Sequence, residues 1–449
     1  MPTDSSARES ASAPPSEISP APLAAATVAA ADSAPDFTVM KVYYGTDRRR
    51  IDTNGAGSLS RLFATGPMVV MLILSILAAA GAVYCRFHKS LAAASIAGIL
   101  MTIGLVVSQQ RGDTDATLAR PAGNASQTVQ RVQYGSDRGE LQLGICEVSI
   151  PKIHKEGKLE GPSVLRLEVR PDPDKHIVVQ RIEPLANKAF YTAVRERVAQ
   201  SPHKDLFIFV HGYNISFDTA ARRTAQIAKD VEFQGAAIFY SWPSQNELLG
   251  YTIDEQNVSW TVTDLKRFLL DVVQRSEARS ISLIAHSMGN RAITNALRQL
   301  ESDLKSEQRI FNEIILAAPD IDADEFKRDI APALTRASKH VTLYASSNDH
   351  ALIASRFVHG YTRAGDSGEG IVVVPGIETV DVSHIDTSLL GHSYYGGSGP
   401  IIKDLTAVLR DYRRAPERTW LRPSERDGVT YWIYESAPVT ARASPGEVR

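Results

Sequence analysis

The chain has 449 residues, of which 43% are hydrophobic and 22% are charged, and its formal net charge is −2. This length suffices for one large domain with additional segments or for two domains. The near-neutral charge gives no reason to expect nucleic acid or an anionic surface as a partner. Two cysteines, Cys85 and Cys146, are too few for a disulfide framework or a cysteine-rich metal site. Neither a Walker-type phosphate loop nor a dinucleotide-binding glycine pattern is present, so we expect no cofactor.

The N-terminal segment, residues 1–35, is rich in Ala, Ser and Pro and has almost no aromatic residues. It cannot bury enough apolar surface to offset the entropy of ordering, so we expect it to be disordered. A basic start followed directly by an apolar core is missing, which argues against a signal peptide. Residues 36–61 are expected to form a short strand-turn element.

Two long uncharged runs follow, at residues 62–85 and 90–110. Each is long enough to cross about 30 Å of hydrocarbon as a helix. The alternative is a pair of buried core helices, but uncharged runs of this length are rare in globular proteins. We therefore predict a transmembrane hairpin over residues 62–110, with helices at about 66–85 and 90–108. Both tails of a hairpin lie on one side of the membrane, and the flanking positive charges favour the cytoplasm only slightly.

A polar linker at residues 111–128 leads into a large domain at residues 129–435, and a flexible tail at residues 436–449 ends the chain. Residues 42–48 resemble residues 132–138, with Val, Tyr, Gly, Asp and Arg at matching positions. This match is too short for a repeat architecture. It is either a duplicated strand-turn element or a coincidence.

The large domain opens with short β-rich segments and then alternates apolar strands with amphipathic helices. The expected opening strands, which would be antiparallel, are residues 141–150, 164–169 and 177–183, followed by a helix over residues 187–200. The expected strands of the alternating part are residues 206–210, 236–240, 280–285, 313–318, 340–345 and 379–383. Its expected helices are residues 217–230, 257–275, 290–301 and 401–412. This pattern indicates a parallel sheet covered on both faces, with functional sites beyond the carboxyl ends of its strands.

A serine between small residues, Ala285-His286-Ser287-Met288-Gly289, follows one of these strands and precedes a helix. Such residues permit the sharp strand-to-helix turn called a nucleophile elbow, which places the serine hydroxyl at the carboxyl edge of the sheet. Motifs of this kind also occur by chance, so an ordinary turn serine is the alternative. We predict that Ser287 is a nucleophile.

Acyl transfer by serine needs a base that accepts its proton and a carboxylate that orients the base. With this elbow, the chain order is serine, acid, histidine. Asp349 follows the strand that ends at residue 345 and is the predicted acid, with Asp320 after the preceding strand as the alternative. His392 lies in the loop before the final helix and is the predicted base. His384, directly at a strand end, has less reach and is the alternative.

The oxyanion that forms in acyl transfer needs backbone N–H donors. We expect them from Met288, directly after the nucleophile, and from Tyr213, where Gly212 permits close approach of the backbone. In the same loop His211 is expected to be a structural hydrogen-bonding residue rather than a second base.

Trp242 and the segment around Tyr251 follow the next strand, so both residues are candidates for the substrate pocket. Ordinary loop packing is an equally good explanation for them.

The sequence also contains an alternation that resembles the start of a calcium loop, at Asp320, Asp322 and Asp324. Glu325 stands where such a loop needs glycine, and Ala331 stands where it needs a bidentate glutamate. We therefore predict no metal site and interpret these aspartates as helix caps.

Five motifs occur in order along the large domain: Phe209-Val210-His211-Gly212-Tyr213-Asn214, Tyr240-Ser241-Trp242-Pro243-Ser244, Ala285-His286-Ser287-Met288-Gly289, Ala318-Pro319-Asp320-Ile321-Asp322 and Gly391-His392-Ser393-Tyr394. Together they resemble a bacterial family of α/β-hydrolases of unknown function, loosely placed in the esterase/lipase superfamily. The resemblance covers about residues 130–412. It implies a triad of Ser287, an aspartate after the seventh strand, and His392, and it supplies no substrate.

These observations predict an α/β-hydrolase fold: a mostly parallel sheet with antiparallel N-terminal strands and helices on both faces, preceded by the transmembrane hairpin. The expected activity is that of a serine hydrolase anchored in a bacterial inner membrane, which cleaves a carboxylic ester of a small molecule or a lipid. A thioesterase or an amidase would use the same triad. A non-catalytic envelope scaffold of the same fold is the alternative from another class.

Overall fold

The computed structural model describes residues 35–52, 132–162, 168, 170–247, 250–304, 309–385 and 399–435. The predicted hairpin at residues 62–110, the linker, both tails and the predicted base His392 lie outside these residues. Within the described ranges, no helix is long and apolar enough to span a bilayer. The described residues from residue 36 onward form one compact unit.

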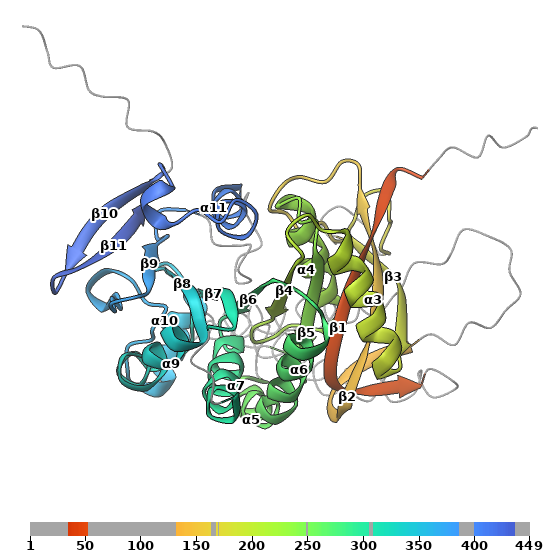
Figure 1. Cartoon of the computed structure of the whole chain (residues 1–449), viewed down its shortest axis with the longest axis horizontal. Helices are drawn as coiled ribbons and strands as arrows, with labels where there is room; N and C mark the ends of the chain where they lie inside the picture. The colour runs from red at the N-terminus through yellow and green to blue at the C-terminus, as the bar shows by residue number, and fades with distance from the viewer. Residues whose placement is uncertain are drawn as a thin grey trace, which may run out of the picture. The chain divides into compact units, whose positions relative to one another are not determined.

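An eleven-stranded sheet organises this unit, with the strand order β10-β11-β9-β8-β7-β6-β4-β5-β1-β2-β3 (Figure 1). The strands are β1 (Phe37–Asp52), β2 (Val132–Pro151), β3 (Val178–Leu185), β4 (Asp205–Val210), β5 (Ala236–Ser241), β6 (Ser280–His286), β7 (Phe311–Ala317), β8 (Ser338–Ala345), β9 (Glu378–Asp381), β10 (Leu421–Arg426) and β11 (Val429–Tyr434). From β11 across to β1 all neighbours are parallel. β2 and β3 at one end and β10 at the other are antiparallel to their neighbours. The predicted fold class is confirmed for this domain.

Helices cover both faces of the sheet. The main ones are α3 (Asn187–Gln200), α4 (Phe217–Asp230), α5 (Tyr251–Trp260), α6 (Val262–Arg275), α7 (Gly289–Leu304), α9 (Ala331–Ala337), α10 (His350–His359) and α11 (Gly399–Leu409). Leu206, Ile208 and Val210 of β4 pack in the cluster that includes α6 and α7. Phe207 and Phe209 of the same strand pack in the cluster that includes α4 and α11. A strand buried on both faces reads as a continuous apolar run, which is why the central strands could be predicted.

Strand β1 lies inside the sheet, between β5 and β2. It pairs in parallel with β5 and antiparallel with β2, and Val42 and Tyr44 in it are fully buried. The sequence predicts a separate element at residues 36–61 and a hydrolase domain that begins at residue 129. The structure corrects this boundary, because residues 37–52 are one of the internal strands. The sequence alone does not show that β1 pairs with β2 and β5, because both strands lie far along the chain.

The chain leaves and re-enters the domain at one place, since Asp52 and Val132 are register partners at the end of the β1–β2 ladder. The two similar segments, residues 42–48 and 132–138, therefore lie on neighbouring strands. The hydroxyls of Tyr44 and Tyr134 form a hydrogen bond of 3.0 Å across this pair.

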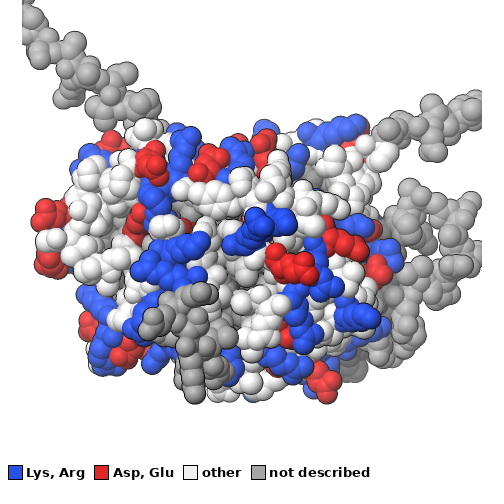
Figure 2. All heavy atoms as spheres, viewed as in Figure 1, with Lys and Arg blue, Asp and Glu red and all other residues white. Residues whose placement is uncertain are grey.

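The C-terminal hairpin β10–β11, which the sequence analysis does not predict, extends the sheet beyond β9. It is anchored by the buried ion pair between Arg418 Nη1 and Asp404 Oδ2 of α11, at 2.6 Å. The expected strand at residues 164–169 lies almost entirely outside the described residues. Acidic and basic side chains are interspersed on the face seen in Figure 2, in line with the near-neutral net charge.

Replacing residues 53–131 with a short Asn-Gly turn should preserve the fold, because such turns connect paired antiparallel strands. Starting the chain at residue 129 should abolish the fold, because β5 and β2 would lose the strand between them. Cooperative thermal unfolding, followed by circular dichroism, measures both. A cooperative transition in the truncated chain at the temperature of the turn-connected chain would contradict this account of β1.

Candidate active site

The turn between β6 and α7 holds Ser287 in a left-handed conformation, with φ of 48°. Positive φ is uncommon for a residue other than glycine and is expected at a nucleophile elbow. The Ser287 N–H donates to Ala317 O on β7 at 2.9 Å. Ser287 O accepts from the backbone N–H of Asn290 at 3.1 Å and from its side-chain Nδ2 at 3.0 Å. The neighbouring strand and the first turn of α7 thus fix the strained backbone.

The loop after β4 presses directly on this elbow. A Cβ added to Gly212 would lie 2.6 Å from His286 Nδ1 and 3.0 Å from the Ser287 Cβ, and one added to Gly289 would overlap His211 O. Only glycine fits at either position. Tyr213 and Met288, the predicted oxyanion donors, directly follow Gly212 and Ser287, so they lie on the two segments that touch.

His211 is a structural residue, as expected. Its Nδ1 donates to Gly212 O at 2.8 Å, and its Nε2 lies 3.1 Å from Ser241 Oγ. Burial and the nearby Arg48 lower the pKa of His211 to about 3, so the ring is neutral. A base already committed in this way is not available to a substrate.

Trp242 supports this loop from the core instead of lining an open pocket. It is fully buried, its Nε1 donates to His211 O at 2.8 Å, and its ring stacks on His211 with centroids 5.1 Å apart. The other pocket candidate, Tyr251, is half-buried and contacts the Tyr213 ring edge-on at 5.3 Å. Its role as a substrate wall stays a prediction.

Arg48 of β1 is a residue that the sequence analysis missed. It is 1% exposed and holds together the loops after β4 and β5. Its guanidinium donates to Ser241 Oγ (2.8 Å), Ser244 O (3.0 Å), Gly135 O (3.0 Å) and Ile215 O (2.7 Å). Burial lowers its pKa to about 10, which leaves it charged at neutral pH. Its only signal in the sequence was its place in the segment that resembles residues 132–138.

Asp320, the alternative acid, is fully occupied by other partners. One carboxylate oxygen accepts from Tyr251 Oη at 2.7 Å and Arg291 Nη2 at 3.1 Å; the other accepts from Ser355 Oγ at 2.5 Å and Arg363 Nε at 2.9 Å. Two bonds to each oxygen use the acceptor capacity of a carboxylate. Burial alone would raise the pKa of Asp320, but the two arginines outweigh it and lower the pKa. Asp320 therefore cannot also orient an imidazole.

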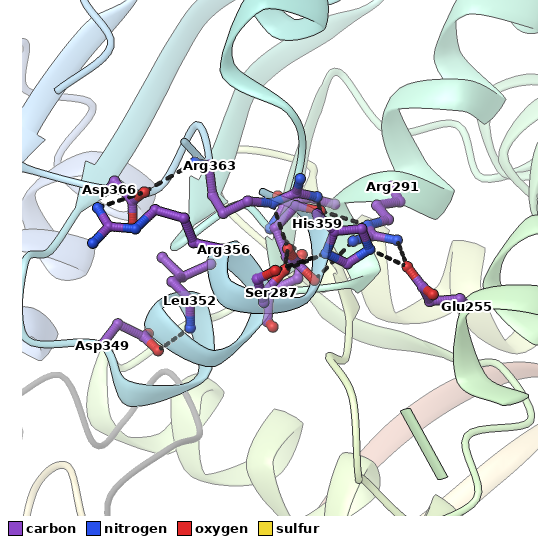
Figure 3. A network of polar contacts seen from close by, with 12 residues as sticks. Glu255, Ser287, Arg291, Asp349, Leu352, Arg356, His359, Arg363 and Asp366 are labelled. Atoms are coloured by element: carbon purple, nitrogen blue, oxygen red, sulfur yellow. Dashed lines mark hydrogen bonds and ion pairs between the residues drawn. The ribbon is translucent and has the colours of Figure 1, made fainter. Parts of the chain in front are cut away.

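The same network joins three helices near Ser287. Arg291 Nη1 of α7 lies 2.6 Å from Glu255 Oε1 of α5, and His359 Nε2 of α10 lies 2.7 Å from the same oxygen. Figure 3 shows these side chains converging beside Ser287. The network fixes α10, and the other candidate acid, Asp349, directly precedes this helix. Sequence spacing gave no signal for it, because its members come from five separate segments.

Asp349, the predicted acid, lies between the end of β8 and the start of α10 and is 4% exposed. Its Oδ1 accepts from Leu352 N at 3.1 Å, so it caps α10 (Figure 3). Next to it, Asn348 Nδ2 donates to Ser383 O at 2.7 Å, which ties this turn to the chain leaving β9. The segment that carries His392 begins two residues later, after Ile385.

The alternative base, His384, is exposed at this turn after β9. The aspartates that resemble a calcium loop act as expected at Asp322, whose Oδ1 accepts from Asp324 N and Glu325 N at the start of a short helix. Among the residues that the structure describes, no group of three or more side chains is placed to hold a metal ion.

The family model of alpha/beta hydrolases of unknown function (DUF900) matches residues 186–410. The chain belongs to this family. This confirms the resemblance seen in the motifs, and the matched region contains Ser287, Asp349 and His392 but not β1, β2 or β3. No curated protein matches the sequence.

Several solved structures are distantly similar to this chain. An esterase from Pyrobaculum calidifontis is 11% identical over 46% of this chain and 77% of its own, with a TM-score of 0.26. The esterase domain of a Rhodothermus marinus protein is 12% identical over 62% of this chain and 95% of its own, with a TM-score of 0.28. Likenesses this distant carry no argument about activity.

Arg48→Met should lower the free energy of unfolding by about 3 kcal/mol or more, because several buried acceptors would lose a charged donor. Arg49→Met is the matched control. Its side chain is 66% exposed and pairs with the exposed Asp137, so its effect should stay within about 0.5 kcal/mol. Urea denaturation followed by tryptophan fluorescence measures the difference. Equal losses for the two variants would contradict the role assigned to Arg48.

Proposed function

We propose that this protein is a serine hydrolase that cleaves carboxylic esters through an acyl-enzyme on Ser287. The single observation that supports this most is the positive φ of Ser287, at the carboxyl edge of a parallel sheet. Backbone strain of this kind costs on the order of 1–3 kcal/mol and persists only where the surroundings enforce it. Here two close-packed glycines and the bonds from β7 and α7 enforce it.

In the proposed reaction, His392 accepts the Ser287 hydroxyl proton as the Oγ attacks the ester carbonyl, and Asp349 orients the imidazole. The N–H groups of Met288 and Tyr213 stabilise the oxyanion. His392 then donates its proton to the alcohol, which leaves. Water attacks the acyl-enzyme with His392 again as base, and the carboxylic acid is released as Ser287 regains its proton.

Two features of the described residues favour Asp349 over Asp320 as the acid. The acceptor sites of Asp320 are taken by two arginines and two hydroxyls, as described above. Asp349 lies beside Asn348, whose side chain binds the backbone at Ser383 just before the segment with His392. This hydrogen bond holds the turn with the proposed acid next to the start of the segment that carries the proposed base.

We further propose that the hairpin at residues 62–110 anchors the enzyme in the inner membrane and that acyl lipids are its substrates. Because Asp52 and Val132 are register partners, a membrane-spanning segment between them must cross the bilayer an even number of times. Two helices meet this condition.

A fluorophosphonate probe, which reacts with activated serines, tests the triad. Ser287→Ala should abolish labelling, and His392→Gln and Asp349→Asn should slow it on the order of 10²- to 10⁴-fold. The matched controls His384→Gln and Asp320→Asn should label within about tenfold of wild type once corrected for the folded fraction. Labelling that persists in Ser287→Ala, or equal losses within each pair, would contradict the assignment.

A series of p-nitrophenyl esters on the full chain tests the substrate class. The value of kcat/KM should rise with acyl length, by up to about fourfold for each methylene that becomes buried. Matched thioesters and amides show which bond is preferred. Rates at the level of Ser287→Ala across the whole series would count against an esterase.

A further inference from the structure

The chain leaves the domain at the edge of the sheet that carries the candidate active site. β1 runs parallel to β5, and Thr46 pairs with Ser241, the last residue of β5. Residues 47–52 therefore extend beyond the carboxyl ends of the parallel strands, and Asp52 meets Val132 there. Ser287 follows the carboxyl end of β6 at the same edge. Residues 53–131, with the two uncharged runs, start and finish on this side.

Helix α5 lies next to this exit along the same edge. Arg138 of β2 donates to Asn257 Oδ1 at 2.8 Å, and its guanidinium lies 5.2 Å from the centroid of the Trp260 ring. On its other side α5 contacts α10, where Tyr251 Oη lies 3.1 Å from Ser355 Oγ. Helix α5 therefore lies between the end of the β1–β2 ladder and α10, beside the candidate site.

Each of these three elements, and the residues directly after α10, carries large exposed apolar side chains. They are Ile51 (46% exposed), Ile253 (51%), Ile353 (42%), Val358 (65%) and Tyr361 (66%). The other large apolar side chains exposed in the described ranges, Val39 and Ile153, lie at the opposite end of the β1–β2 ladder, where Phe37 pairs with Pro151. The large exposed apolar side chains of the described ranges are therefore more numerous on the elements at the carboxyl edge of the sheet than at the opposite end of this ladder.

We propose that this edge of the domain, which carries Ile51, Ile253, Ile353, Val358 and Tyr361, docks on the lipid bilayer, so that the candidate active site opens toward the membrane. The proposal rests on the proposed function, because the hairpin at residues 62–110 supplies the anchor. Apolar side chains with a nearby anchor enter the interfacial region of a bilayer. Arg49 and Arg356, with side chains 66% and 54% exposed, lie on the same elements and are suited to lipid phosphates. An ester within the bilayer would then reach Ser287 without crossing water.

Quenching by spin-labelled lipid tests this orientation in the full chain. The chain is reconstituted in vesicles of phosphatidylethanolamine and phosphatidylglycerol that contain a doxyl-labelled lipid. An environment-sensitive fluorophore is attached at Val358→Cys or, as the matched control, at Ile153→Cys, in a Cys85→Ser background. The two native side chains are 65% and 64% exposed, and the remaining Cys146 is buried. Quenching at position 358 should exceed quenching at position 153 by about threefold or more.

Equal quenching at the two positions, or none at position 358, would overturn the proposal, as would a chain that does not float with the vesicles. Fluorophosphonate labelling on the same vesicles separates this result from the proposed function. Labelled protein without selective quenching means that the docking surface alone is wrong. Selective quenching without labelling means that the serine hydrolase assignment is wrong while the orientation stands.

Discussion

The pairing of β1 between β5 and β2 is the constraint on which the rest of the structure depends. An internal strand must find backbone partners on both sides, and β1 supplies them to two strands that would otherwise be edges. Its buried arginine also holds the loops after β4 and β5, one of which packs against the elbow at Ser287. The residues before the predicted membrane hairpin are therefore part of the hydrolase fold, although the matched family region does not include them.

In the candidate site, close packing supports a strained backbone. Ser287 keeps a left-handed backbone because Gly212 and Gly289 let a neighbouring loop close against it. Two buried aspartates nearby differ in what surrounds them. Asp320 is bound by Arg291 and Arg363 and ties helices together, whereas Asp349 caps a helix at the edge of the sheet. Both aspartates follow a strand, so their position does not distinguish them. The residues that surround each one distinguish the structural carboxylate from the proposed catalytic one.

Much of the fold and of the candidate site could be predicted from the sequence, and the features that could not each have a physical reason. The central strands were predictable because burial on both faces makes them continuously apolar, and the elbow was predictable because it needs small residues around Ser287. The place of β1 could not be predicted, because a pattern within a segment does not identify its partner. The sequence left open whether Trp242 lines the pocket or packs in the loop, and the part played by Arg48 was missed, because the direction and burial of a side chain depend on tertiary packing. Strand β10 carries charged residues and a proline, which hide the apolar alternation of a strand. Strand β11 is rich in β-branched and aromatic residues, a signal for a strand that was overlooked.

Amide hydrogen exchange on the full-length protein, followed by mass spectrometry, tests the place of β1 most directly. Peptides that cover residues 42–46 should exchange as slowly as those that cover residues 206–210 of β4, because both strands are buried and hydrogen-bonded on both sides. Rapid exchange at residues 42–46, with residues 206–210 still protected, would contradict the account.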